Sequence, residues 1–202
     1  MVVNQMKYFG KLTLVTIFLI KLLFMNSIYA NNPEKVSENK VKHVIDFTRK
    51  DFIRNWNSTT DRVMGGLSNG NVTYKEGVPY FSGDISLANN GGFSLINTHI
   101  EQIPSALNTI VIDVQGDGLV YQLRLAMLVD GYRLAYKYDF KTTANRRQKI
   151  SFLLQDFQAV FRGRVIENAP LLESHKIQEI GFLIGAKQEG AFALSLFNAE
   201  FQ

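Results

Sequence analysis

Short apolar runs separated by turn residues follow one another from residue 43 to the end of the sequence. Regularly spaced short runs of this kind are typical of a β-sandwich or a β-barrel. The runs predicted to form strands are Val44–Phe47, Val72–Lys75, Pro79–Ser86, Phe93–Asn97, Thr109–Val114, Leu119–Val129, Arg133–Phe140, Gln148–Leu154, Gln178–Ile184 and Ala191–Phe201. A short helix has room only within Phe47–Asn55 and Leu171–Glu179. We therefore predict an all-β architecture of two packed antiparallel sheets.

Strict alternation marks the two runs on either side of Asp130-Gly131. This dipeptide is a strong hairpin signal, because both residues tolerate the positive φ of a type I′ turn. Successive strand side chains point to opposite faces, and the large apolar residues share one of them: Tyr121, Leu123, Leu125, Met127, Val129, Leu134, Tyr136 and Tyr138. The other face carries Gln122, Arg124, Arg133, Lys137 and Asp139. The first face is predicted to be core and the second to be solvated or functional.

The first 30 residues are typical of a secretory signal peptide. Lys7 and Lys11 precede an apolar stretch, and Ala30 supplies a small residue at the cleavage point. The stretch of roughly 14 residues is shorter than the ~20 needed to span a bilayer. We expect cleavage near Asn31 and export to the periplasm or the extracellular space. An uncleaved anchor is the alternative, and it would be the only membrane contact.

The rest of the chain is predicted to be a flexible lead-in over residues 31–42 and one β-sandwich domain over residues 43–202. The whole chain has 202 residues, 46% of them hydrophobic, and a formal charge of +4. Without residues 1–30 it has 19 basic and 18 acidic residues, which lack the basic field that nucleic-acid binding requires. Cysteine is absent, so disulfides, thiolate nucleophiles and cysteine-based zinc sites are excluded.

Catalytic and metal-binding motifs are not satisfied. Ser68 lies in a G-x-S-x-G match, but glycines precede it and a β-like run follows, whereas a nucleophile elbow needs a strand before and a helix after. Asp113–Gly118 begins like a calcium loop, yet its twelfth position is Arg124 rather than a bidentate glutamate. The three histidines, His43, His99 and His175, have no metal-ligand spacing, and no Rossmann fingerprint is present. We expect no catalytic residue, no metal and no cofactor.

Three polar clusters remain as candidates for binding. Trp56–Gly70 combines a lone tryptophan, an aspartate and two adjacent glycines, which indicates a backbone in close approach to another group. Leu87–Phe93 is a tight Asn/Gly turn that leads into a predicted strand. Phe157–Arg164 has two arginines around a glycine, near Lys187-Gln188, and arginine binds carboxylates bidentately or stacks on rings.

Taken in order, these clusters resemble the complex I intermediate-associated protein 30 family, with the resemblance running from about Ile45 to Phe201. The motif residues that carry it, and that we take as candidate binding residues, are Trp56, Asp61, Met64, Gly65, Gly66, Ser68, Asn89, Asn90, Gly91, Gly92, Phe93, Tyr121, Arg124, Phe161, Arg162, Gly163, Arg164, Lys187 and Gln188. The resemblance implies a galactose-binding-like jelly-roll sandwich and a non-catalytic role. Mitochondrial members of the family act as assembly chaperones for respiratory complex I.

The sequence departs from the family pattern at four positions. Arg147 stands where a tryptophan is usual, Asn97 where an arginine is usual, Ala186 where an aspartate is usual and Ala191 where a proline is usual. The changes at 147 and 97 put ligand contacts at those positions in doubt, while the fold is unaffected.

Two functional hypotheses follow. The first is an exported module that binds a protein partner and assists assembly in the envelope, because export removes the chain from the soluble arm of complex I. The second is a carbohydrate-binding module, with Trp56, Tyr132 and Tyr136 as candidate aromatic platforms.

Overall fold

The computed structural model describes residues 41–202 apart from residue 186. The predicted signal peptide, most of the predicted lead-in and Ala186 lie outside the described residues. Within the described part of the chain, no helix is long and apolar enough to cross a membrane.

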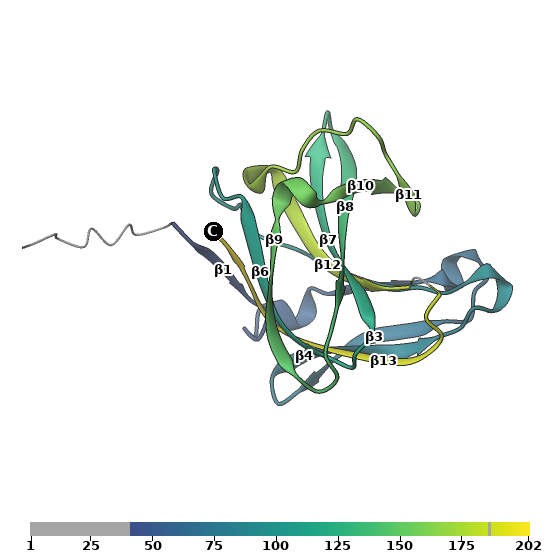
Figure 1. Ribbon diagram of the computed structural model, residues 1–202. Helices are drawn as coiled ribbons and strands as arrows, with labels where there is room; N and C mark the ends of the chain where they lie inside the picture. The colour runs from purple at the N-terminus through teal and green to yellow at the C-terminus, as the bar shows by residue number, and fades with distance from the viewer. Residues whose placement is uncertain (1–40, 186) are drawn as a thin grey trace, which may run out of the picture. The chain divides into compact units, whose positions relative to one another are not determined.

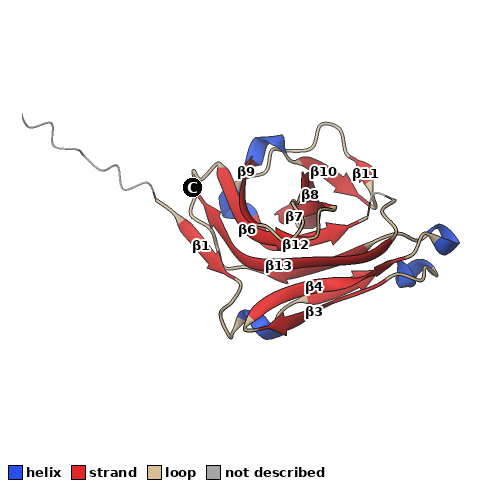
Figure 2. Cartoon of the chain, turned by 60° about the horizontal axis from the view of Figure 1, so that its bottom comes forward, coloured by secondary structure: helices blue, strands red, loops and turns tan. Residues whose placement is uncertain are grey.

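Thirteen strands form two antiparallel sheets (Figure 1). The six-stranded sheet has the order β3-β4-β13-β6-β9, with β1 also paired to β13; its strands are β1 (His43–Asp46), β3 (Asn69–Lys75), β4 (Val78–Ile85), β6 (Thr109–Gly116), β9 (Arg147–Leu153) and β13 (Gly190–Phe201). The seven-stranded sheet has the order β11-β10-β8-β7-β12-β5-β2; its strands are β2 (Asn57–Thr60), β5 (Ser94–His99), β7 (Val120–Val129), β8 (Tyr132–Lys141), β10 (Gln158–Phe161), β11 (Arg164–Val165) and β12 (Ile177–Ile184). Figure 2 shows β13, β4 and β3 side by side along one side of the domain. The predicted fold class is confirmed.

Alternate side chains of the two sheets meet in one hydrophobic core. Aromatic rings join the layers: Tyr138 of β8 lies 5.0 Å from Phe152 of β9, and Phe140 of β8 lies 6.0 Å from the same ring, measured between ring centroids. Such pairs add about 0.5–1.5 kcal/mol each beyond their area burial. The alternation predicted around Asp130 and Gly131 is correct, since both residues adopt positive φ (49° and 82°) between β7 and β8.

All ten predicted strands are present, with ends that differ by a few residues, and three strands were missed. β2 is polar throughout, and β10 and β11 are short and flank the Arg162-Gly163 turn, so none of the three shows an apolar alternation. The two segments with room for a helix each contain one 3-10 turn, η1 (Phe52–Arg54) and η5 (Ser174–Lys176). The other 3-10 turns are η2 (Asp61–Met64), η3 (Ala88–Asn90) and η4 (Leu154–Asp156).

The last two strands of the chain occupy central positions in both sheets. β13 lies between β4 and β6, and β12 lies between β5 and β7. β12 and β5 approach closely at Gly181, where a Cβ atom would lie only 2.4 Å from the backbone oxygen of Ile96. This pairing brings segments that are about 80 residues apart in sequence onto one face of the seven-stranded sheet.

We predict that Gly181→Ala lowers stability by about 2 kcal/mol, because the added methyl group forces β5 and β12 apart. Urea unfolding followed by circular dichroism measures the change. An unaltered transition midpoint would show that the two strands separate at this point without cost.

Candidate functional site

Asp61 is a buried carboxylate that ties two loops together. Its oxygens accept hydrogen bonds from the backbone and hydroxyl of Ser68, and from the backbone N–H groups of Gly92 and Phe93. The Ser68 hydroxyl oxygen in turn accepts from the N–H of Ser86 at 3.0 Å. One side chain therefore joins residues 61–68 to residues 86–93, and we call these two segments together the loop end. Figure 2 shows their 3-10 turns, η2 and η3, at the same end of the domain.

The glycines of these motifs leave room for that carboxylate. A Cβ at Gly66 would lie 2.3 Å from the Asp61 Cγ, and a Cβ at Gly91 would lie 2.6 Å from an Asp61 oxygen. Gly65, with φ of +88°, ends η2, and its carbonyl accepts from the Asn89 side chain at 3.0 Å. The geometry thus gives Asp61, Gly66, Ser68, Gly91 and Gly92 a structural role in the loop end.

The hydrogen bonds keep Asp61 ionised. Burial raises the pKa of a carboxyl group, but the bonds from Ser68, Gly92 and Phe93 outweigh burial and hold the pKa of Asp61 below its ordinary value of 3.8. The stability gained from the charged form is complete above that value and is lost as the pH falls through the folded-state pKa.

The loop end also presents large apolar side chains to solvent. The exposed fractions are 72% for Val63, 70% for Met64, 55% for Leu67 and 36% for Leu87. Exposed apolar groups on rigid loops are typical of surfaces that contact another macromolecule. Of the predicted motif residues, Met64 is therefore the apolar one whose side chain is free to bind here.

Tyr121 and Gln188 have structural roles. The buried Tyr121 hydroxyl donates to Asp117 at 2.9 Å, and both burial and the nearby negative charge raise the pKa of this tyrosine. Gln188 accepts from the Val120 N–H at 2.9 Å and donates to the Val120 carbonyl at 2.7 Å, so it pairs with the start of β7. Lys187 and Asn90 are exposed in turns, at positive φ.

The arginine pair predicted as a binding element forms an exposed hairpin. Arg162 and Gly163 lie at the turn between β10 and β11, and both have positive φ. Arg162 stacks 5.4 Å from the ring of Phe161, which is 62% exposed, and Arg164 is exposed on the edge strand. The side chains of Phe161, Arg162 and Arg164 are therefore exposed and accessible to a partner.

A polar pocket lies on the outer face of the seven-stranded sheet, which we call the polar face. The residues that line it are Leu95, Asn97, Arg124, Leu125, Ala126, Arg133, Ala135, Glu179, Ile180 and Gly181. The guanidinium of Arg133 donates to Glu179 through two nitrogens, at 2.9 and 2.7 Å, and the Asn97 amide donates to the same carboxylate at 2.9 Å. The bonds from Arg133 are the main reason that the pKa of Glu179 is lowered despite burial. Asn97, Arg133 and Glu179 thus form one preorganised network.

The register of the strands aligns polar residues in a row across the polar face. Asn57, Asn97, Gly181, Arg124, Lys137 and Gln158 are successive cross-strand partners on β2, β5, β12, β7, β8 and β10. We call these six residues the transverse row. Neighbouring strands lie about 4.8 Å apart, so the row spans roughly 24 Å. Gly181 separates Asn97 from Arg124 in the row and is itself buried.

Arg124 differs from its neighbours in lacking a carboxylate partner. Its guanidinium is half-buried and donates to Gln122 at 3.0 Å, and of the described residues none forms an ion pair with it. Burial, and then repulsion by Arg133, lower the pKa of Arg124. Arg124 lines the pocket, and this bond to Gln122 uses one of the guanidinium group's five N–H donors.

Sequence reasoning selected Arg124 but missed Asn97, Arg133 and Glu179 as site residues. The alternation in β7 and β8 placed Arg124 and Arg133 on one polar face, which was the available signal. Asn97 on β5 and Glu179 on β12 reach the site because β12 pairs with β5 and with β7. A local sequence pattern does not reveal this pairing.

The predicted aromatic platforms are not on the polar face. Tyr136 is 1% exposed and lies in the core, so its prediction as a platform is wrong. Trp56 packs against Phe47 and Phe182, with ring centroids 5.6 and 6.4 Å away. Tyr132 is 79% exposed, but it lies at the tip of the β7–β8 hairpin.

At two of the positions that depart from the family pattern, the residues make strong contacts. The guanidinium of Arg147 stacks 3.6 Å from the ring of Phe197. It also donates to the Asp113 carboxylate through two nitrogens, so Asp113 forms an ion pair with Arg147. Asn97 belongs to the polar face, as described above. Ala191 is exposed on β13, where it pairs with Asp84.

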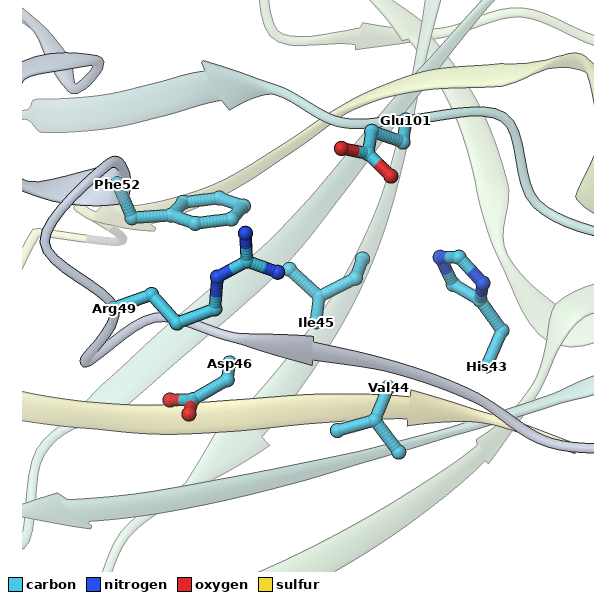
Figure 3. A pocket seen from close by; sticks show the side chains of 7 residues that line it. All are labelled: His43, Val44, Ile45, Asp46, Arg49, Phe52 and Glu101. Atoms are coloured by element: carbon cyan, nitrogen blue, oxygen red, sulfur yellow. The ribbon is translucent and has the colours of Figure 1, made fainter.

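Two further pockets contain charged residues without forming a site. Figure 3 shows one beside β1, where Arg49, His43 and Glu101 surround Ile45; the Arg49 guanidinium is paired with Asp51 at 2.7 Å. His99 and His175 line another. Across the described residues, no group of three or more His, Asp or Glu is arranged to hold a metal ion.

Comparison with known proteins identifies a family and a fold. A family model described as Complex I intermediate-associated protein 30 matches residues 45–196. No curated protein matches the sequence. Among solved structures, the family 11 carbohydrate-binding module of the cellulosomal cellulase Lic26A-Cel5E of Clostridium thermocellum is similar, with a TM-score of 0.59 and 13% identity over 80% of this chain and 94% of that one. A family 11 module from the same organism, in complex with a β-1,3-1,4-mixed-linked tetrasaccharide, has a TM-score of 0.57 and 13% identity over 79% and 94%.

We predict that Asp61→Asn lowers the free energy of unfolding by about 3 kcal/mol at pH 7, because the amide nitrogen meets N–H donors and the charged acceptor is lost. Guanidinium unfolding at a series of pH values measures the effect. The difference from the unsubstituted protein should shrink as the pH falls below 3.8, where Asp61 itself becomes protonated.

Asp84→Asn is the matched control, since Asp84 is exposed on β4. It should change stability by less than about 0.5 kcal/mol. Equal losses in the two variants would rule out a special role for the buried carboxylate.

Proposed function

We propose that this chain, which belongs to the complex I intermediate-associated protein 30 family, is a non-catalytic binding module that recognises a carbohydrate on its polar face. The observation that carries the proposal is the network of Asn97, Arg133 and Glu179, which sets donors and acceptors in fixed positions inside one pocket. Binding sites gain affinity when such groups are held in place before the ligand arrives.

The chemistry of the polar face suits a polyhydroxylated ligand. Sugar hydroxyls both donate and accept hydrogen bonds, and the pocket offers carboxylate acceptors beside guanidinium and amide donors. Ala126, Ala135 and Gly181, which line the same pocket, have small or no side chains, so the longer polar side chains are the groups that a ligand meets. The transverse row extends this surface across six strands, over a length that fits several sugar units in a linear chain.

The fold supports the same proposal. The family 11 module whose complex with a tetrasaccharide is known has this architecture, although identity of 13% relates the two by fold alone. The predicted signal peptide adds export to the proposal, which would bring the module to envelope or extracellular glycans.

We predict that Asn97→Ala lowers glycan affinity at least 10-fold while leaving the melting temperature within about 2 °C. Isothermal titration calorimetry against a panel of neutral and acidic oligosaccharides provides the measurement. The loss follows from removing one donor of the transverse row and one bond that orients Glu179.

Gln115→Ala is the matched control, because Gln115 lies on β6 in the other sheet. Its affinity should equal that of the unsubstituted protein. If no oligosaccharide class binds, or if the two variants lose affinity equally, the polar face is not a carbohydrate site.

A protein partner is the second candidate function, and the exposed apolar residues of the loop end favour it. Val63, Met64 and Leu67 are more than half exposed and are held rigidly through Asp61. The family's association with assembly of a protein complex agrees with such a surface. The exposed hairpin that carries Arg162 and Arg164 offers a second contact surface, which is polar rather than apolar.

We predict that Met64→Asp combined with Leu67→Asp abolishes retention of a discrete protein from envelope extract on the immobilised module, because the charges remove the apolar contact. Leu171→Asp is the control, since Leu171 is 68% exposed elsewhere on the surface. Arg162→Ala with Arg164→Ala tests the hairpin in the same assay. Retention that survives both double variants would contradict both proposed contacts.

A further inference from the structure

The transverse row carries positive charge without negative charge. Arg124 and Lys137 are its two ionisable members, and the other four are amides and a glycine. The carboxylates of the polar face lie outside the row and are engaged: Glu179 with Arg133 at 2.7 Å and Asp139 with Lys137 at 3.2 Å. Of the two cations in the transverse row, Arg124 is therefore the one that forms no ion pair with a described residue, although the more distant charge of Asp139 partly offsets the repulsion by Arg133.

Because Arg124 is half-buried, the lack of an ion-pair partner costs more than it would at the surface. A guanidinium in water has its donors solvated, but that of Arg124 is half-buried in a pocket and donates to one neutral amide. Repulsion from Arg133 adds to the cost of its charge. A negatively charged ligand group would supply the missing acceptor, and charge-assisted bonds from arginine to a carboxylate are among the strongest that proteins form.

Asn97 and Arg124 lie on either side of Gly181 in the transverse row. Gly181 is the cross-strand neighbour of Arg124 on one side and of Asn97 on the other, and all three residues line the same pocket. The close approach of β5 excludes a side chain at Gly181, where a Cβ would lie 2.4 Å from the Ile96 oxygen. A ligand group in this pocket can therefore meet a guanidinium donor from β7 and an amide donor from β5.

We infer that the polar face recognises an acidic glycan, with the carboxylate of one uronic-acid unit bound by Arg124 in this pocket. This inference rests on the proposed carbohydrate function and adds the chemical class of the sugar. Asn97 would donate to the same unit from the other side of Gly181, and Lys137 would attract the acid group of a neighbouring unit. Arg133 and Glu179 hold the pocket in shape rather than neutralising the ligand.

Paired oligosaccharides that differ only in charge test the inference. Oligogalacturonate, oligoalginate and a glucuronate-containing oligosaccharide are each titrated beside their carboxyl-reduced counterparts, by calorimetry on the purified protein in 0.15 M salt. At this ionic strength the Debye length is about 8 Å, so distant charges contribute little. At least one acidic form should bind 10-fold more tightly than its reduced counterpart.

Arg124→Gln should remove that preference, lowering affinity for the acidic form at least 10-fold and affinity for the reduced form less than about 3-fold. Arg146→Gln, a substitution at an exposed residue just before β9 of the other sheet, is the matched control and should preserve the preference. If Arg124→Gln fails to fold, Lys137→Gln probes the same row on the adjacent strand, β8, and should reduce the preference for chains of two or more acidic units.

The outcomes separate the two proposals. Equal binding of acidic and reduced forms, or an equal loss of both on Arg124→Gln, overturns the acidic-glycan inference and leaves carbohydrate binding in place. Absence of binding to every charged and neutral oligosaccharide overturns both.

Discussion

The placement of β12 between β5 and β7 is the constraint on which the polar face depends. Residues from four separate stretches of sequence become neighbours only because this strand joins them in register. The close contact between β12 and β5 at Gly181 fixes the distance between Asn97 and Arg124, and the same strand supplies Glu179. A shift of one residue in this register would turn Ile180 and Phe182 out of the core and Glu179 and Gly181 into it.

The buried carboxylate of Asp61 is the second structural constraint, and it organises the apolar surface of the loop end. Four hydrogen bonds to one side chain hold two glycine-rich loops, and those loops expose Val63, Met64 and Leu67. Loops of this composition lose much conformational entropy on folding, so a buried charged acceptor offsets that loss locally. The motif residues around Asp61 therefore hold the loops in place. The neighbouring side chains of Val63, Met64 and Leu67 are the ones that can contact a partner.

The molecule thus combines a rigid polar face and a rigid apolar loop end on one sandwich. We propose a polyhydroxylated, acidic ligand for the first and a macromolecular partner for the second. The chain belongs to the complex I intermediate-associated protein 30 family, and its likeness to a carbohydrate-binding module is one of fold. Family ancestry and fold by themselves leave the ligand open, because function resides in sites carried on a fold.

The sequence by itself determined the fold class, ten of the strands, the Asp130-Gly131 hairpin and the polar character of one face of β7 and β8. These features follow from local rules: side-chain alternation, turn-forming residues and apolar runs. It left β2, β10 and β11 unrecognised, because β2 is entirely polar and β10 and β11 have only four and two residues, too few to show an alternation. It also did not distinguish Asp61, which is buried and structural, from Arg124, which is available for binding. That distinction was decided by tertiary structure, since burial and hydrogen-bond partners depend on residues that are distant in sequence and meet only when the sheets pair and pack.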